Sequence, residues 1–251
     1  QITGIYEEKD SWSSLNNTSY DGVASRSAYK EEIKTIEPMI NYRTLFRDLH
    51  QVEALIGYSY QDFVEESFRD SNRTFITDAF SYNNLGAGLA ISEGKYANPV
   101  SSYKSSNKLI AFFGRMNYSY NNKYMLSLSL RHEGSTKFGK DNKWGNFPAI
   151  SAGWNINRER FMESVSFIND LKLRFGYGVT GNQGISSYLS LQQLGTSGYM
   201  FYNGKWIQGY APVSNANPNL RWEKKIENNL GFDIGLFNNI VVNVDLYNRK
   251  T

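Results

Sequence analysis

The segment NYSYNNKYMLSLSLRHEGSTKFG, residues 117–139, alternates apolar and polar side chains after its Asn-Asn pair. One set of alternate positions is wholly apolar: Tyr124, Leu126, Leu128 and Leu130. The positions between them are mostly polar: Met125, Ser127, Ser129 and Arg131. A period of two is typical of a β-strand with two unlike faces. The fold class therefore depends on what covers the apolar face, a protein core or lipid.

The same alternation recurs along the chain. It predicts strands over residues 35–46, 51–60, 108–120, 124–131, 147–157, 171–179, 222–236 and 240–247, with a ninth over 24–33. One segment differs, because Phe161, Met162, Val165 and Ile168 fall at helical spacing. We therefore expect an all-β chain with a single short helix over 158–169.

The connections between these strands differ in length in a regular way. Short turns at 47–48, 121–122 and 238–239 alternate with long loops at 62–107, 132–146 and 180–221. This alternation is typical of an antiparallel, up-and-down transmembrane β-barrel, which has short turns at one end and long loops at the other. An ordinary β-sandwich rarely sorts its connections in this way.

Side-chain placement favours the same interpretation. Aromatic residues gather near the short turns, as in the interfacial girdle of a membrane barrel, although they could also cap a soluble core. They are Tyr42, Phe46, Tyr118, Tyr120, Tyr124, Trp154 and Phe237. Seven charged residues share the polar side of the strands, where a small core would bury them at high cost. They are Arg115, Lys172, Arg174, Lys225, Glu227, Asp233 and Asp245. We therefore predict that Leu126, Leu128 and Leu130 face lipid.

Composition excludes several function classes. The 251 residues include no cysteine, which excludes disulfides and thiolate metal sites, and the two histidines lie far apart in the sequence. The net charge of +3 comes from interspersed signs, without the basic stripe that nucleic-acid binding requires. No nucleophile elbow, phosphate-binding loop or dinucleotide motif is present. We expect neither an enzyme nor a cofactor; a glycosidase would need paired carboxylates across a cleft.

Three longer blocks are more specific. They are RHEGSTKFGKDNKWGNFPAISAGW (131–154), LKLRFGYGVTGNQGI (171–185) and NPNLRWEKKIENNLGFDIGLFNNIVVNVDLYNRKT (217–251). Together they closely resemble the corresponding blocks of SusC/RagA-type TonB-linked outer-membrane proteins. The departures, Glu133 for Asp, Gly176 for Ser and Lys224–Lys225 for a Thr-rich pair, do not threaten the resemblance. We interpret six residues of these blocks as fold-maintaining, with substrate contact as the alternative: Gly134, Gly139, Gly145, Pro148, Asn182 and Gln183.

The resemblance implies a fold and a function. Such proteins form barrels of about 22 strands closed by an N-terminal plug. We therefore expect residues 1–251 to be part of a larger barrel, without the plug. The implied function is TonB-dependent import of oligosaccharides or peptides across the outer membrane of a Gram-negative, Bacteroidetes-like cell. The implied partners are a SusD-like surface lipoprotein, the TonB complex, reached through the N-terminal part, and outer-membrane lipid. A TonB-dependent siderophore or other nutrient receptor is the alternative, followed by a secreted carbohydrate-binding sandwich.

The candidate binding residues are aromatic. Tyr199, Tyr202, Trp206 and Tyr210 belong to GYMFYNGKWIQGY in the last long loop, and Trp144 to the first motif block. Aromatic side chains stack on sugar rings, so we expect contact with substrate or with the lid lipoprotein. The alternative is that these side chains only pack the loop.

Overall fold

The computed structural model describes residues 2–13, 21–96 and 99–251. Its strands are β1 (Ile2–Ser13), β2 (Val23–Ile36), β3 (Met39–Phe46), β4 (His50–Arg73), β5 (Val100–Tyr120), β6 (Tyr124–Ser135), β7 (Trp144–Asn155), β8 (Ile168–Asn182), β9 (Gln193–Tyr202), β10 (Lys205–Ser214), β11 (Glu223–Leu236) and β12 (Ile240–Lys250). Three short 3₁₀ helices complete them: η1 (Leu85–Ala87), η2 (Ile156–Arg158) and η3 (Arg160–Met162). None of the helices in these described ranges is long and apolar enough to cross a membrane.

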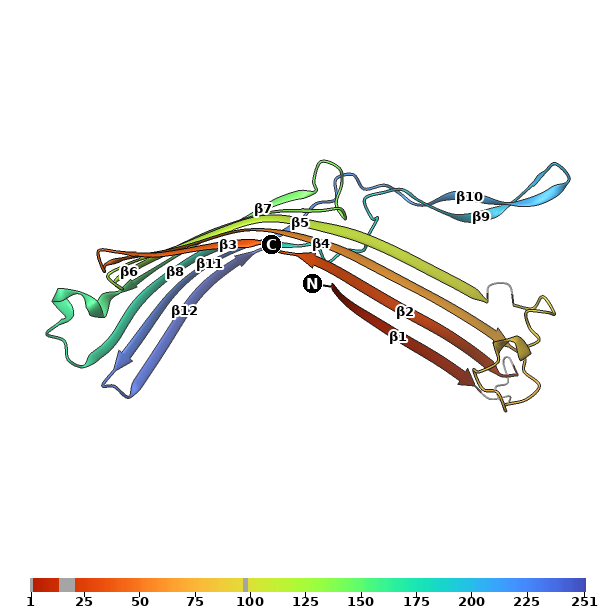
Figure 1. The fold of residues 1–251 in the computed structure, drawn as a ribbon, viewed down its shortest axis with the longest axis horizontal. Coiled ribbons are helices and arrows are strands. Elements are labelled where there is room, and N and C mark those ends of the chain that lie inside the picture. The colour runs from red at the N-terminus through yellow and green to blue at the C-terminus, as the bar shows by residue number, and fades with distance from the viewer. Residues whose placement is uncertain (1, 14–20, 97–98) are drawn as a thin grey trace. The chain divides into compact units, whose positions relative to one another are not determined.

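The strands follow one another in the order of the sequence. The main sheet has the order β1-β2-β4-β5-β6-β7-β8-β11-β12, with β3 also paired to β4, while β9 and β10 form a separate two-stranded sheet. Neighbours such as β5 and β6, β6 and β7, and β8 and β11 run antiparallel (Figure 1). The predicted all-β, up-and-down arrangement is confirmed. The described strands form a section of such a sheet, not a closed barrel.

The chain divides into two compact units. The first comprises residues 1–35 and 61–107. It contains β1, most of β2 and the distal parts of β4 and β5. Its connection after β4 folds back onto the sheet, because Phe75 N–H donates to the Asp21 carbonyl at 2.9 Å. The buried amide of Asn72 also holds this connection, donating to the carbonyls of Leu85 at 2.9 Å and Gly88 at 2.8 Å.

Two expectations about this first unit were wrong. The loop placed at 62–107 is shorter, because β4 continues to Arg73 and β5 begins at Val100. Strand β1 was not predicted at all. The added parts of β4 and β5, such as EESFRDSNR and VSSYKSSN, carry polar residues at successive positions. Backbone hydrogen bonds hold such strands together whatever their side chains are. The sequence therefore lacks the alternation of apolar and polar residues by which a strand is recognised.

The second unit comprises residues 36–60 and 108–251. The helix expected over 158–169 is absent from it: η2 and η3 make two short turns, and β8 begins at Ile168. Phe161 remains 62% exposed, so the helically spaced side chains have no core to face. The other two long loops are also reduced, the first to residues 136–143 and the second by the β9–β10 hairpin.

Tight turns form one end of this unit. Both central residues have positive φ in the turns at Arg47–Asp48, Asn121–Asn122 and Phe237–Asn238, as in the type I′ turns that suit twisted hairpins. The last turn is centred one residue before its predicted position. Asn121 N–H donates to the Leu49 carbonyl at 2.7 Å, which joins the first two turns. Because neighbouring strands are antiparallel, the loops 136–143 and 183–222 lie at the opposite end of the strands. This end was predicted for loop 183–222.

Candidate functional site

The second unit has one apolar and one polar face. Residues paired across neighbouring strands share a face. One row of such pairs runs Tyr118, Leu126, Ala152, Phe175, Leu230 and Leu246. The adjacent row runs Asn117, Ser127, Ser151, Gly176, Asn229 and Tyr247. The division into an apolar and a polar face, which was predicted for single strands, thus continues across β5, β6, β7, β8, β11 and β12.

The apolar face is uncovered. Ile56 is 61% exposed, Leu130 51%, Phe175 44% and Leu246 60%. Leaving a side chain of this size in water forgoes about 1.5–3 kcal/mol relative to burying it. A whole face of such residues therefore fits contact with lipid or another apolar surface rather than with water.

A belt of aromatic rings crosses this face near the tight turns. Its contacts run from Phe46 to His50 at 6.1 Å between ring centroids, then to Tyr120 at 4.9 Å. Tyr120 contacts Tyr124 at 6.3 Å, and Tyr124 contacts Trp154 at 6.3 Å. We call this row the turn-side belt. It contains four members of the girdle expected from the sequence, Phe46, Tyr120, Tyr124 and Trp154, and adds His50.

A second belt lies towards the loop end. Tyr58 contacts Phe112 at 5.2 Å, and Phe112 contacts Trp144 at 6.5 Å. Trp144 also stacks on His132, with ring centroids 4.6 Å apart and planes within 4°. We call this row the loop-side belt. It was not predicted, because its members come from four strands whose register fixes their common level.

The two belts are separated by the height of a membrane. Phe112 and Tyr120 are eight residues apart on β5, and Trp144 and Trp154 are ten apart on β7. At about 3.3 Å per residue and a strand tilt of about 40°, the spacing is roughly 20–25 Å. The apolar band of outer-membrane barrels is about 25 Å tall and has aromatic girdles at both interfaces.

The carboxylate of Glu159 joins the turn-side belt to the connection between β7 and β8. It accepts hydrogen bonds from the hydroxyl of Tyr124, from Trp154 Nε1 at 3.1 Å and from Lys123 Nζ at 3.1 Å. These donors, Tyr124 first, hold the pKa of the Glu159 carboxyl below its ordinary value. This cluster was not predicted from the sequence, because it assembles only when β6, β7 and the connection are folded.

The polar face contains a groove of about 470 Å³. Glu53, Asn117, Ser127, Lys172 and Arg174 are among the residues that line it. Small side chains form part of its floor, and the charged ones lie towards the turn end of the strands. This face can therefore hold water or a polar chain, which suits the wall of an aqueous lumen.

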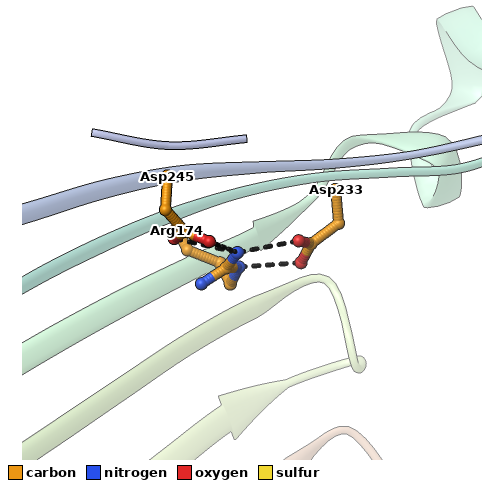
Figure 2. A network of polar contacts seen from close by, with 3 residues as sticks. All are labelled: Arg174, Asp233 and Asp245. Carbon is orange, nitrogen blue, oxygen red and sulfur yellow. Dashed lines mark hydrogen bonds and ion pairs between the residues drawn. The ribbon is translucent and has the colours of Figure 1, made fainter. Parts of the chain in front are cut away.

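Arg174 forms a network across three strands of this face (Figure 2). From β8 it donates to Asp233 on β11, with Nε–Oδ2 at 2.7 Å and Nη2–Oδ1 at 2.8 Å. Its Nη2 also lies 3.2 Å from Asp245 Oδ1 on β12. A Cβ at Gly231, between them on β11, would lie 2.7 Å from the Arg174 guanidinium. The glycine thus leaves room for the guanidinium to pass over the middle strand.

The three motif blocks meet at the loop end. Phe138, Phe147 and Trp222 form a buried cluster, in which Trp222 lies 4.8 Å from Phe138 and 5.1 Å from Phe147 between ring centroids. Trp222 Nε1 also donates to the Lys143 carbonyl at 2.8 Å. We call this cluster the loop clamp, because it joins loop 136–143 to the segment that precedes β11.

Close approaches in the loop clamp explain the motif glycines. A Cβ at Gly139 would lie 1.8 Å from the Pro218 carbonyl oxygen, and one at Gly181 would lie 2.3 Å from the Phe147 ring. Asn182 accepts a hydrogen bond from Gly184 N–H at 2.8 Å. These contacts support a fold-maintaining role for Gly139 and Asn182. The role expected for Gln183 is not supported, because its side-chain oxygen Oε1 is buried without a hydrogen-bond partner.

Most of the candidate binding residues lie on the β9–β10 hairpin. Tyr199 is 68% exposed, Tyr202 65%, Trp206 69% and Tyr210 71%. Tyr199 pairs with Gln208, while Tyr202 pairs with Lys205 and belongs to the other face. The structure thus groups Tyr199, Trp206 and Tyr210 on one face and separates Tyr202 from them.

The hairpin itself was missed, although the sequence contains its signal. Asn203 and Gly204 both have positive φ at its turn, and Asn-Gly is a strong hairpin signal between alternating segments. Phe201 contacts Trp206 edge-on at this hairpin, with 5.4 Å between ring centroids.

Trp144 does not join the hairpin residues. It lies in the loop-side belt on the apolar face, against His132 and Phe112. Within the described ranges, no group of His, Cys, Asp and Glu side chains could hold a metal ion.

Comparison with known proteins places these features in a family context. Residues 2–251 match the family model described as TonB dependent receptor-like, beta-barrel. The TonB-dependent receptor P39 of Formosa agariphila is 37% identical over 217 residues, covering 86% of this chain and 20% of that protein. The TonB-dependent receptor SusC of Bacteroides thetaiotaomicron is 39% identical over 154 residues, covering 60% of this chain and 15% of that protein.

Solved structures agree in fold. The RagAB peptide transporter matches with a TM-score of 0.87 at 24% identity, covering 99% of this chain and 27% of that one. The RagAB peptide importer in its closed-closed state matches with a TM-score of 0.84 at 25% identity, with the same coverage. The chain spans about a fifth of the length of the curated relatives it matches.

Proposed function

Because the chain belongs to the TonB-dependent receptor-like β-barrel family, we propose that it forms part of the barrel wall of an outer-membrane importer. The importer takes up oligosaccharides or peptides with energy from TonB. The observation that carries this proposal is the two-faced sheet: an apolar face between two aromatic belts opposite a polar, grooved face. Such a wall separates lipid from an aqueous path, and transport requires no catalytic group.

The RagAB neighbours support the peptide cargo that we propose, and the resemblance of the motif blocks supports the oligosaccharide cargo. SusC is a TonB-dependent receptor, and the RagAB neighbours are described as a peptide transporter and a peptide importer. This chain shares with that family the three motif blocks that form its loop clamp. We therefore propose a SusD-like surface lipoprotein as its lid, and coupling to the TonB complex through the N-terminal part of the whole protein. The cell is Gram-negative and Bacteroidetes-like, as the Formosa and Bacteroides relatives suggest.

We assign the candidate residues by the surface they occupy. Tyr199, Trp206, Tyr210 and, on the other face, Tyr202 are exposed on the hairpin and remain candidates for contact with substrate or lid. Trp144 lies with the lipid-facing belt, so we assign it to the membrane interface. The groove beside Arg174 faces the import path.

Growth tests the proposal. A strain that lacks the full-length protein should fail to grow on one oligosaccharide or peptide mixture as sole carbon source, yet grow on the free monomers. A strain without TonB should share the defect. Normal growth on every polymer, combined with a defect only under iron limitation, would instead identify a siderophore receptor.

A further inference from the structure

We propose that the connection between β7 and β8 inserts into the inner, phospholipid leaflet of the outer membrane. This connection, residues 156–167, contains η2 and η3, and we call it the interfacial foot. It lies at the end of the strands that has the tight turns, which in outer-membrane barrels is the periplasmic end, and it is longer than those turns (Figure 1). The inference rests on the proposed function, because it assigns a lipid partner to one connection of the barrel wall.

Hydrogen bonds give the interfacial foot a defined backbone. Met162 N–H donates to the Glu159 carbonyl at 2.9 Å, and Val165 N–H donates to the Met162 carbonyl at 2.9 Å. The side-chain amide of Asn157 donates to the Asn169 carbonyl at 3.2 Å, which joins the foot to the start of β8. The foot therefore presents its side chains in a set arrangement.

Glu159 holds the interfacial foot on the apolar side of the sheet. Its carboxylate accepts hydrogen bonds from Tyr124 and Trp154, which belong to the apolar face and to the turn-side belt. A plug or a cargo molecule would lie in the lumen, against the opposite face. Since β7 and β8 lie inside the sheet, between β6 and β11, further strands of the whole protein would pair elsewhere. At the level of the belt, the foot is therefore continuous with the membrane interface.

The interfacial foot exposes large aromatic side chains. Phe161, in η3, is 62% exposed, and Phe167 is 51% exposed. Phe167 contacts Phe237 of the neighbouring turn, with 6.0 Å between ring centroids, and its carbonyl accepts a hydrogen bond from Phe237 N–H at 2.9 Å. Interfacial segments bury Phe, Trp and Leu at the boundary between headgroups and acyl chains. These exposed rings fit that boundary.

Cations accompany the exposed rings. Arg158 and Arg160 are both exposed. Lys123 Nζ lies 3.1 Å from the Glu159 carboxylate and compensates its charge. The remaining charges of the foot are the two arginines and the exposed Glu163. A guanidinium binds a phosphate through two parallel hydrogen bonds, and every phospholipid headgroup offers a phosphate at this level. Exposed aromatic rings beside two arginines therefore match the chemistry of a phospholipid interface.

Quenching by spin-labelled lipid tests the insertion. In the full-length protein, with no other cysteine, the fluorophore NBD is attached to Phe161→Cys, to Ile150→Cys on the apolar face of β7, or to Ser151→Cys on its polar face. The vesicles contain phosphatidylethanolamine, phosphatidylglycerol and a phosphatidylcholine spin-labelled at the headgroup or deep in the acyl chain. Headgroup-labelled lipid should quench the Phe161→Cys probe at least about threefold more than the Ser151→Cys probe. Chain-labelled lipid should quench the Ile150→Cys probe most.

Charge variants test the phosphate contact. Replacing both arginines by glutamate, Arg158→Glu with Arg160→Glu, should reduce the quenching of the Phe161→Cys probe by headgroup-labelled lipid at least about twofold, because phosphate repels a carboxylate. The matched control, Arg158→Lys with Arg160→Lys, keeps the charge and should retain the quenching. Equal quenching in both double variants would show that the arginines do not contact phosphate, and this would overturn the inference.

The Ile150→Cys probe separates failure of the inference from failure of the proposed function. If lipid quenches Ile150→Cys but quenches Phe161→Cys as weakly as Ser151→Cys, protein covers the interfacial foot and the inference is wrong. If lipid quenches none of the three probes, the apolar face does not contact the membrane, and the proposed barrel wall is wrong as well.

Discussion

An arginine at Ile150 should destabilise the membrane-inserted protein strongly. Ile150 lies on the apolar face of β7, paired with Leu128 on β6 and Tyr177 on β8. It is six residues from Trp144 in one belt and four from Trp154 in the other. At about 3.3 Å per residue and a tilt of about 40°, these separations place it roughly 15 Å and 10 Å from the belts. An arginine this close to the bilayer midplane costs about 2–4 kcal/mol.

The adjacent residue provides a matched control. Ser151 is on the same strand but on the polar face, where its cross-strand partners are Ser127 and Gly176. It is exposed, and these small neighbours leave room for a longer side chain. We expect Ser151→Arg to change the free energy of unfolding by less than about 1 kcal/mol, since lumenal positions tolerate charge. Urea unfolding of the full-length protein in lipid vesicles measures both variants.

Spin labels distinguish lipid from a packed protein core, which would also reject an arginine. A label at Ile150→Cys should be reached by oxygen, which concentrates in lipid, and shielded from a water-soluble nickel reagent. A label at Ser151→Cys should show the larger nickel accessibility of the two. If neither reagent reaches Ile150→Cys, that face packs against protein, and the reasoning from the two belts is wrong.

Two further substitutions test the ends of the strands. Gly139→Ala should push the new Cβ against the Pro218 carbonyl and destabilise the loop clamp by about 1–3 kcal/mol, seen as faster proteolysis of loop 183–222. Gly176→Ala is the control, because its new Cβ would make only an ordinary contact at 3.9 Å, and it should leave the proteolysis rate unchanged. If the two variants are cleaved at the same rate, the role assigned to Gly139 is wrong. Because the pKa of Glu159 is lowered, its contribution to stability is present above the ordinary glutamate pKa and is lost as pH falls through the lowered value. Glu159→Gln should therefore reduce thermal stability at pH 7 and flatten its decline in acid; an unchanged pH profile would show that the carboxylate contributes nothing.

The sequence alone was sufficient to predict the strands that have one apolar and one polar face. A strand between lipid and water must alternate apolar and polar residues, and this period is a local property visible in residues 124–131. The turn at Asn121–Asn122 was equally predictable, because Asn-Asn accepts the positive φ of a type I′ turn at low cost. The motif blocks supplied the family resemblance, and with it the partners and cargo that we propose.

Only the tertiary structure decided which residues from different strands meet. Trp144 reads as a loop residue in the sequence, yet the register of β7 against β6 places it over His132 in a belt. Arg174 reaches Asp245, 71 residues away in the sequence, only because Gly231 on the intervening strand has no side chain. Strand register and close approach also depend on the partner strands and on the turns that join them, so the apolar period of one segment does not determine them by itself. The distal parts of β4 and β5 could not be predicted for a similar reason. Backbone hydrogen bonds hold these polar strands in the sheet, and such bonds do not require any particular pattern of side chains.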